Sequence, residues 1–150
     1  MSRILVVDDE PIIRMLLVES LEDAGYTVTA ARNGAEAIHR ALEQRSDMVL
    51  LDLLMPGMDG FRFLRERRDH PHLANVPVIV LSAAGMDGLR DASQLRANAV
   101  LSKPVDLDVL SAVIDHVLRE WRATARRPRD RHWLVRHSRR RTTRHRRQRS

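Results

Sequence analysis

The chain has 150 residues, of which 43% are hydrophobic, so it is long enough to bury one core and is expected to form one domain. It contains no cysteine, which excludes a disulfide framework, a thiolate metal site and a cysteine nucleophile. Met1 is not followed by a signal-peptide pattern, and no apolar run approaches the roughly 20 residues of a membrane span. A cytoplasmic protein without a membrane segment is therefore expected.

The formal net charge of +6 conceals two segments of opposite charge. Residues 124–150 contain twelve arginines against one acid, Asp130, which gives +11. Residues 1–123 contain fourteen basic and nineteen acidic residues, which gives −5. Like charges repel, and the basic segment has little to bury apart from Trp133, Leu134 and Val135. We therefore expect a domain over 1–123 and a disordered, Arg-rich tail over 124–150.

Five short apolar runs alternate with helical patterns, which predicts an α/β fold around a parallel sheet. The expected strands are residues 3–8, 27–31, 48–52, 76–81 and 99–102. Five helices are expected between and after these strands. The first begins at Pro11 and ends before Gly25, and the second begins at a capping box formed by Asn33 and Glu36. The third begins at about residue 61, the fourth covers about 87–95, and the fifth begins at Asp106.

Apolar spacing predicts which helical residues face the sheet. They are Ile13, Leu16, Leu17, Ser20, Leu21 and Ala24 in the first helix, Ile38 and Leu42 in the second, Phe61 and Leu64 in the third, and Val109, Leu110, Val113, Ile114, Val117, Leu118 and Trp121 in the last.

Acidic residues stand where two of the apolar runs end. Asp8 and Asp9 follow the first run, and Asp52 closes the third. The carboxyl ends of parallel strands meet at one edge of a sheet, so these carboxylates are expected to lie together. Mg²⁺ prefers carboxylate and phosphate oxygens, and a carboxylate can act as a nucleophile toward phosphorus. The pattern predicts a cation and phosphoryl site, with Asp9 and Asp52 as ligands and Asp8 acting through water.

Two further strand-end residues suit a phosphoryl group. Lys103 is the only lysine of the chain, and a compact ammonium acts as a point charge on phosphate. Ser82, after the run 78–81, can donate a hydroxyl hydrogen bond. Each residue taken singly could also be a helix cap. Three carboxylates about 4 Å apart repel by roughly 4 kcal/mol per pair at an effective dielectric of about 20, which favours a bound cation.

Four strings of residues resemble the receiver domain of bacterial two-component response regulators. They are Ile4 to Glu10, Leu51 to Gly60, Ser82-Ala83 and Ser102-Lys103-Pro104, and the resemblance covers about residues 2–122. It implies a flavodoxin-like, doubly wound sheet of five parallel strands in the order 2-1-3-4-5.

The resemblance also implies a site and a reaction. Asp52 would accept phosphate from a sensor histidine kinase or a histidine phosphotransfer protein. Asp9, Asp52 and the backbone carbonyl of Leu54 would bind Mg²⁺, and Asp8 would assist through water. The chain would then catalyse only its own phosphorylation and dephosphorylation at Asp52, and would not be an enzyme acting on a separate substrate.

Lys103 and Ser82 would contact the phosphoryl group, and the Lys103–Pro104 bond would be cis. Receivers usually carry Tyr or Phe three residues before this lysine, but here that position is Val100. A single-domain response regulator is expected. Phosphorylation would alter the surface of the fourth helix, fifth strand and fifth helix, which could bind a downstream protein or a second copy of the chain.

Two other functions stay open. The twelve tail arginines could grip nucleic-acid phosphates without reading sequence. Strand-end aspartates also occur in phosphatases that pass through an aspartyl phosphate, although no second acid stands two residues after Asp52 here. The tail itself has a simpler explanation, because Arg-rich ends without pattern also arise when a GC-rich reading frame shifts.

Overall fold

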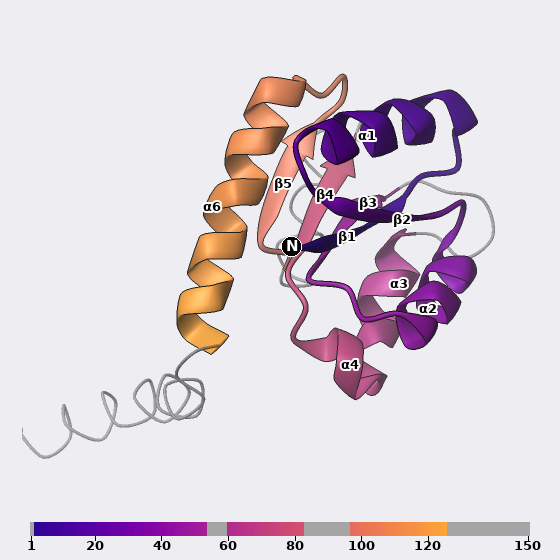
Figure 1. Cartoon of the computed structure of the whole chain (residues 1–150). Coiled ribbons are helices and arrows are strands. Elements are labelled where there is room, and N and C mark those ends of the chain that lie inside the picture. The colour runs from indigo at the N-terminus through magenta and orange to yellow at the C-terminus, as the bar shows by residue number, and fades with distance from the viewer. Residues whose placement is uncertain (1, 54–59, 83–96, 126–150) are drawn as a thin grey trace, which may run out of the picture. The chain divides into compact units, whose positions relative to one another are not determined.

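The computed structural model describes residues 2–53, 60–82 and 97–125. Its elements in chain order are β1 (Arg3–Val7), α1 (Pro11–Asp23), β2 (Thr27–Ala31), α2 (Gly34–Glu43), β3 (Met48–Asp52), α3 (Gly60–Glu66), the 3₁₀ turn η1 (Arg67–Asp69), α4 (Pro71–Ala74), β4 (Val78–Ser82), β5 (Ala99–Ser102) and α6 (Leu107–Ala125), as shown in Figure 1.

The five strands form one parallel sheet in the order β2-β1-β3-β4-β5, which confirms the order that the resemblance to receiver domains implied. The register aligns their carboxyl ends: Val7 is paired with both Ala31 and Leu51, and Ser82 with Ser102. Residues that follow these strands are therefore brought to one edge of the sheet.

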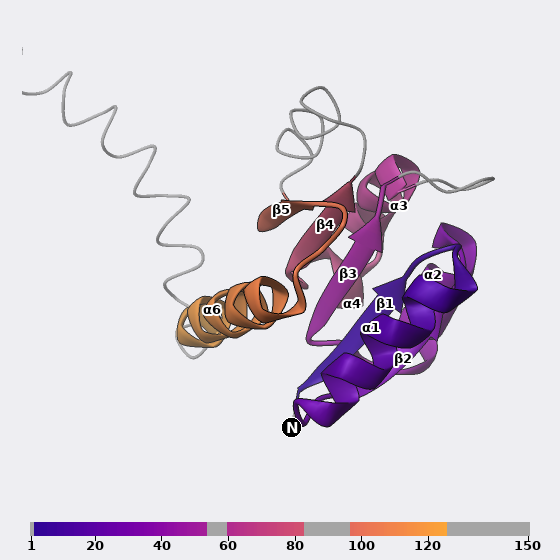
Figure 2. The same ribbon diagram turned by 90° about the horizontal axis from the view of Figure 1, so that it is seen from above.

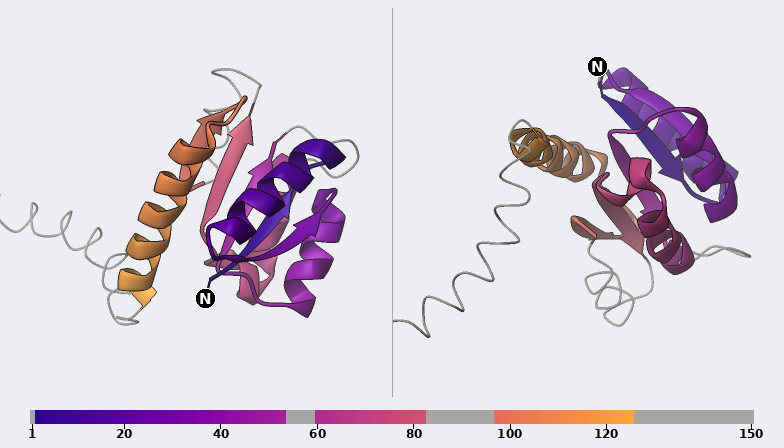
Figure 3. Two further views of the ribbon diagram at one scale, coloured as in Figure 1. Left: turned by 45° about the horizontal axis from the view of Figure 1, so that its top comes forward. Right: turned by 90° about the horizontal axis from the view of Figure 1, so that it is seen from below.

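Helices cover both faces of the sheet, as Figure 2 and Figure 3 show. Successive strand residues point to opposite faces. In β1, Ile4 and Val6 belong to a core with α1 and α6, whereas Leu5 and Val7 belong to a core with α2, α3 and α4. All residues of β3 and β4 are buried, which explains why their sequences read as continuous apolar runs.

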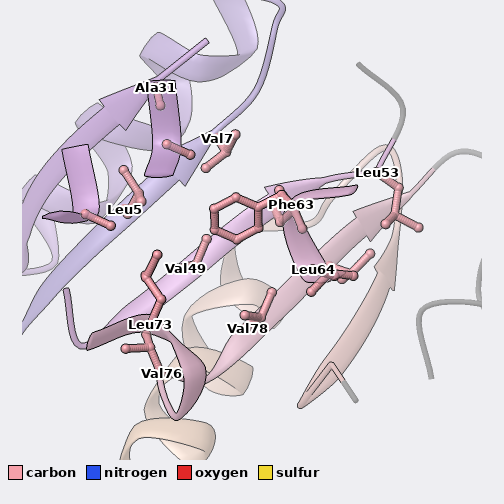
Figure 4. Packing of buried hydrophobic residues seen from close by; sticks show 14 residues of the cluster. Leu5, Val7, Ala31, Val49, Leu53, Phe63, Leu64, Leu73, Val76 and Val78 are labelled. Carbon is pink, nitrogen blue, oxygen red and sulfur yellow. The ribbon is translucent and has the colours of Figure 1, made fainter. Parts of the chain in front are cut away.

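The core under α2, α3 and α4 is shown in Figure 4, where Phe63 lies among side chains from the strands. Phe63 and Leu64 are fully buried, and Phe61 is only half-buried. The prediction for this helix was thus right for Leu64 and, since Phe61 packs against the core, also for Phe61, but it missed Phe63.

Four predicted inward residues are wrong, and for three of them smaller or neighbouring residues of the same helix face the sheet instead. Leu16 is 54% exposed while Leu17 and Leu21 are buried, and Val109 is 49% exposed while Leu110 is buried. In α2, Ala37 and Ala41 pack on the sheet, and Leu42 is 50% exposed. Ala24, the residue that caps α1, is also exposed.

The helix boundaries follow their predicted signals. Gly25 has φ of +100°, a conformation that suits glycine, and it directly follows the α1 cap. The Asn33 side chain accepts the Glu36 N–H at 2.8 Å. Asp106 Oδ1 accepts the N–H of Asp108 at 2.8 Å at the start of α6. The fourth strand begins later than predicted, at Val78, because the N–H of Val76 still closes the turn after α4.

Two side chains extend the sheet at the amino ends of its strands. Asp47 Oδ2 accepts the N–H of Arg3 at 2.7 Å while the N–H of Asp47 donates to the Arg3 carbonyl at 2.8 Å. In the same way, Asn98 Oδ1 accepts the N–H of Val78 at 3.0 Å, and the N–H of Asn98 donates to the Val78 carbonyl at 2.8 Å. Each residue thus makes a pair of bonds such as a neighbouring strand would make.

Arg67 is a buried arginine that the sequence analysis did not identify. Its Nη1 donates to the carbonyl oxygens of Leu73, Ala74 and Val76 at 3.2, 3.4 and 2.8 Å. Burial, together with the nearby charge of Arg68, lowers the pKa of Arg67. The side chain ties the turn after α3 to the segment that leads into β4.

The chain divides into two compact units, Met1–Leu118 and Arg119–Ser150, so α6 spans the division. The predicted boundary between residues 123 and 124 stays a prediction, and so does the disordered tail, since 126–150 lie outside the described residues. The expected helix at 87–95 also lies outside them. Among the described residues, no helix is both long enough and apolar enough to cross a membrane.

Candidate functional site

The first part of the site is the turn between β1 and α1. β1 ends at Val7, and the polar residues Asp8, Asp9 and Glu10 follow it. The pairing with β2 continues for one more bond, since the N–H of Asp8 donates to the Ala31 carbonyl at 3.1 Å. Asp8 Oδ1 then accepts the N–H of Glu10 at 2.9 Å, which closes a turn just before Pro11 opens α1. Asp8 is buried at the carboxyl end of β1.

The second part is the end of β3, where Asp52 is 4% exposed and pairs with Leu81 of β4. Gly60, the first residue of α3, lies against this strand end, and its N–H donates to the Leu53 carbonyl at 2.9 Å. A Cβ at Gly60 would lie 2.5 Å from Leu53 Cα and 2.6 Å from the Asp52 carbonyl oxygen. Only glycine fits this close approach without a backbone shift.

Lys103 joins the two acidic strand ends. Its Nζ lies 3.3 Å from Asp52 Oδ2 and 3.4 Å from Asp8 Oδ2. Burial alone would lower the pKa of the Lys103 ammonium, but the Asp52 and Asp8 carboxylates outweigh burial and raise this pKa above its usual value. The backbone N–H of Lys103 donates to the Ser82 carbonyl at 3.1 Å, and the Lys103–Pro104 bond is cis, as expected.

The acidic turn offers the oxygen ligands that a hard cation needs. Carboxylate oxygens of Asp8, Asp9 and Glu10 lie within 4.8 Å of one another. Such a donor set fits Mg²⁺, which takes carboxylate oxygens together with water and phosphate oxygens. The donor chemistry of the described residues thus agrees with the cation that the sequence pattern predicted.

The structure brings together Asp8, Asp52 and Lys103, and it places Ser82 at the same edge through the pairing of β4 with β5. Asp9 lies beside Asp8 in the β1–α1 turn. Leu54, whose carbonyl was expected to bind Mg²⁺, lies outside the described residues.

Two neighbours of the site were missed by the sequence analysis. Glu10 shares the acidic turn with Asp8 and Asp9, and Arg14 Nη1 donates to the Asp8 carbonyl at 2.8 Å. A basic residue one helical turn after an acidic turn is a signal that could have indicated Arg14.

An apolar groove of about 240 Å³ adjoins Lys103. It is lined by Ile13, Leu16, Leu17, Leu81, Lys103, Pro104, Val105 and Leu107. Near it, α1 exposes Ile12 and Met15 to 74% and 59%. The site therefore opens beside an apolar surface on α1.

Residues 4–115 match the family model described as response regulator receiver domain. Response regulator Rre1 of Synechocystis is 36% identical over 124 residues, which cover 81% of this chain and 54% of that protein. Sporulation initiation phosphotransferase F of Bacillus subtilis is 35% identical over 118 residues, covering 78% of this chain and 94% of that protein. The chain thus spans about half of one relative and nearly all of the other.

Solved structures show the same fold. Chemotaxis protein CheY4 of Vibrio cholerae aligns with a TM-score of 0.74 at 30% identity, covering 78% of this chain and 98% of that one. A response regulator receiver domain protein of Clostridium thermocellum aligns with a TM-score of 0.76 at 29% identity, covering 82% and 98%.

Proposed function

Because the chain belongs to the receiver domain family of response regulators, we propose that it is a cytoplasmic signalling domain of residues 1–123 that accepts phosphate on Asp52. The observation that carries this proposal is the position of Lys103 Nζ, 3.3 Å from Asp52 and 3.4 Å from Asp8. A buried carboxylate at a strand end, with one ammonium and further acids beside it, is suited to receive a phosphoryl group in the presence of a cation.

The reaction transfers a phosphoryl group from a phosphohistidine to an Asp52 carboxylate oxygen. The new P–O bond forms as the P–N bond breaks, and the donor imidazole nitrogen leaves with its electron pair. The ammonium of Lys103 stabilises negative charge on the phosphoryl oxygens, and the Ser82 hydroxyl donates a hydrogen bond to one of them.

Asp9, Asp52 and the Leu54 carbonyl would hold Mg²⁺, with Asp8 acting through water. When bound, the ion neutralises charge on the phosphoryl oxygens. Close carboxylates repel in the absence of a cation, which supports this assignment.

Receiver domains interact with histidine kinases or phosphotransfer proteins, and a protein donor must reach Asp52 over the surface beside it. We assign its docking to the apolar groove and the exposed residues Ile12, Met15 and Leu16 of α1. A surface patch of this kind next to a reactive group is typical of a protein interface.

Phosphorylation adds about −1.5 to −2 charges beside Lys103. Val100 of β5 is half-buried and paired with Val80. This position therefore has no aromatic side chain that could change its orientation when Asp52 is phosphorylated. We propose that β5 itself, joined to the site through the Lys103 N–H and the Ser82 carbonyl, carries the change to a downstream protein or a second copy bound at α6 and β5.

The test is phosphorylation with acetyl phosphate and Mg²⁺, followed by mass spectrometry. One hydroxylamine-sensitive phosphate is expected on Asp52, and Asp52→Asn should abolish it. Asp9→Ala should weaken Mg²⁺ binding more than Asp8→Ala does, since Asp9 is assigned to contact the ion directly. Labelling of Asp52→Asn at the wild-type level would contradict the proposal.

The same preparation separates this function from a phosphatase. A phosphatase that passes through an aspartyl phosphate would turn over a small phosphomonoester many times. The receiver is expected to retain one phosphate per chain and to release none from a phosphomonoester in excess.

A further inference from the structure

Asp8 uses all four of its polar groups in contacts with the rest of the domain. Its N–H donates to the Ala31 carbonyl, its Oδ1 accepts the Glu10 N–H, and its Oδ2 lies 3.4 Å from Lys103 Nζ. Its carbonyl accepts Arg14 Nη1 at 2.8 Å. Because the residue is only 1% exposed, water cannot readily replace any of these partners.

Arg14 ties the acidic turn to α1. Its guanidinium reaches back six residues to the Asp8 carbonyl, and its backbone N–H donates to the Glu10 carbonyl at 2.9 Å. The turn from Asp8 to Glu10 is therefore bound to Arg14 at both of its ends. The mechanism proposed above gives Arg14 no role.

The contact also brings a permanent positive charge to a crowded acidic turn. The carboxylates of Asp8, Asp9 and Glu10 lie within 4.8 Å of one another and repel. A guanidinium stays protonated in proteins, and its hydrogen bond to a carbonyl is stronger than that of a neutral donor. Arg14 thus fixes the course of the turn and adds a positive charge next to it, while Lys103 pairs with the Asp8 carboxylate.

We propose that Arg14 is a positioning residue for the cation, which holds the β1–α1 turn so that the Asp9 carboxylate is preorganised to bind the ion and the Asp8 carboxylate to assist through water. This inference rests on the Mg²⁺ site of the proposed function. Partners that orient metal-binding residues typically change metal affinity by about 10- to 100-fold when they are removed.

The test is calorimetric titration of Mg²⁺ into the full chain and its Arg14→Gln and Arg14→Lys variants. Glutamine is neutral and too short to span the distance, so the Mg²⁺ dissociation constant should rise about tenfold or more. Lysine keeps the charge and a donor, and should recover most of the affinity. Arg40→Gln, at an exposed arginine near the end of α2, is the matched control and should bind like the wild type.

Melting temperatures without Mg²⁺ separate positioning from simple stabilisation. A variant Arg14→Gln that melts lower but binds Mg²⁺ within twofold of wild type would overturn the inference, as would equal losses in the Gln and Lys variants. If Arg14→Gln does not fold, Arg14→Met is titrated in its place against the same thresholds. Wild-type protein that binds Mg²⁺ in this Arg14-dependent way but takes no phosphate on Asp52 would contradict the proposed function and support this inference.

Discussion

At the scale of single residues, Lys103 determines how the charges of the site balance. Its side chain, which is 15% exposed, lies between two buried carboxylates that would otherwise repel, and removing the ammonium leaves those buried charges uncompensated. We expect Lys103→Met to lower the free energy of unfolding by about 3 kcal/mol without Mg²⁺ and by less with it. Urea unfolding at both Mg²⁺ levels measures this, and an equal loss at both would contradict the charge-balance explanation.

The raised pKa of Lys103 also gives this contribution a pH dependence. A group whose pKa is higher in the folded state stabilises the fold fully below its unfolded pKa, about 10.4, and loses that effect as pH rises through the folded value. The stability difference between wild type and Lys103→Met should therefore be constant near neutral pH and shrink above about pH 10.4. Thermal melts between neutral and alkaline pH test the direction.

Gly60 is the other single residue with a sharp prediction. A Cβ there meets backbone atoms of Leu53 and Asp52, which cannot move aside as a flexible side chain would. We expect Gly60→Ala to lower the free energy of unfolding by about 1–3 kcal/mol and to slow phosphorylation by acetyl phosphate.

Gly25→Ala is the matched control for Gly60→Ala. Gly25 has positive φ, but a Cβ added there would have no atom within 4 Å, and the residue follows the end of α1 that lies away from the site. The substitution should cost about 1 kcal/mol and leave the phosphorylation rate unchanged. Equal effects of the two variants on phosphorylation would contradict the close-approach argument.

At the scale of elements, the strands were predicted more accurately than the buried faces of the helices. A strand buried on both sides reads as an apolar run whatever its neighbours are, so β1 and β3 could be placed from sequence. In α1, apolar residues lie on two faces, and only the packing of Leu17 and Leu21 on the sheet decides that Leu16 faces outward. Periodicity alone cannot distinguish a core face from an interface.

The outer face of α1 carries a prediction of its own. Leu16→Glu adds a charge to the proposed docking surface without disturbing the core, since Leu16 is 54% exposed. Transfer from the histidine kinases of the source organism should fall at least tenfold, while phosphorylation by acetyl phosphate stays unchanged. Leu42→Glu, at a similarly exposed leucine of α2, is the control. Loss of both reactions in Leu16→Glu would contradict a docking role.

At the scale of the whole molecule, the gathering of Asp8, Asp52 and Lys103 at one edge was predicted because parallel strands bring their carboxyl ends together. The strand order was predicted from the resemblance to receiver domains. Arg67 and Arg14 could not be predicted in the same way. Their partners are carbonyl groups of nearby turns, and which carbonyls face an arginine depends on the folded backbone.

The charge division of the chain yields a prediction for the whole molecule. Residues 126–150 carry the twelve arginines and Asp130, a charge of +11, beside −5 for the rest. If the tail binds nucleic acid, the affinity for duplex DNA should fall steeply with salt concentration. Binding should also disappear when residues 126–150 are deleted, without loss of Asp52 phosphorylation. Fluorescence anisotropy across a salt series measures the affinity, and undiminished binding by the truncated chain would exclude the tail as the segment that binds DNA.

The paired bonds that Asp47 and Asn98 make with Arg3 and Val78 have a consequence for local opening. An amide that is hydrogen-bonded to a neighbouring segment exchanges its proton with solvent only when that hydrogen bond opens. The Arg3 and Val78 amides should therefore exchange as slowly as those inside the sheet, and Asn98→Ala should speed exchange at Val78 alone. Local opening of the sheet would then begin at the carboxyl ends of the strands, where Asp52 is to be phosphorylated, while the amino ends of β1 and β4 stay closed.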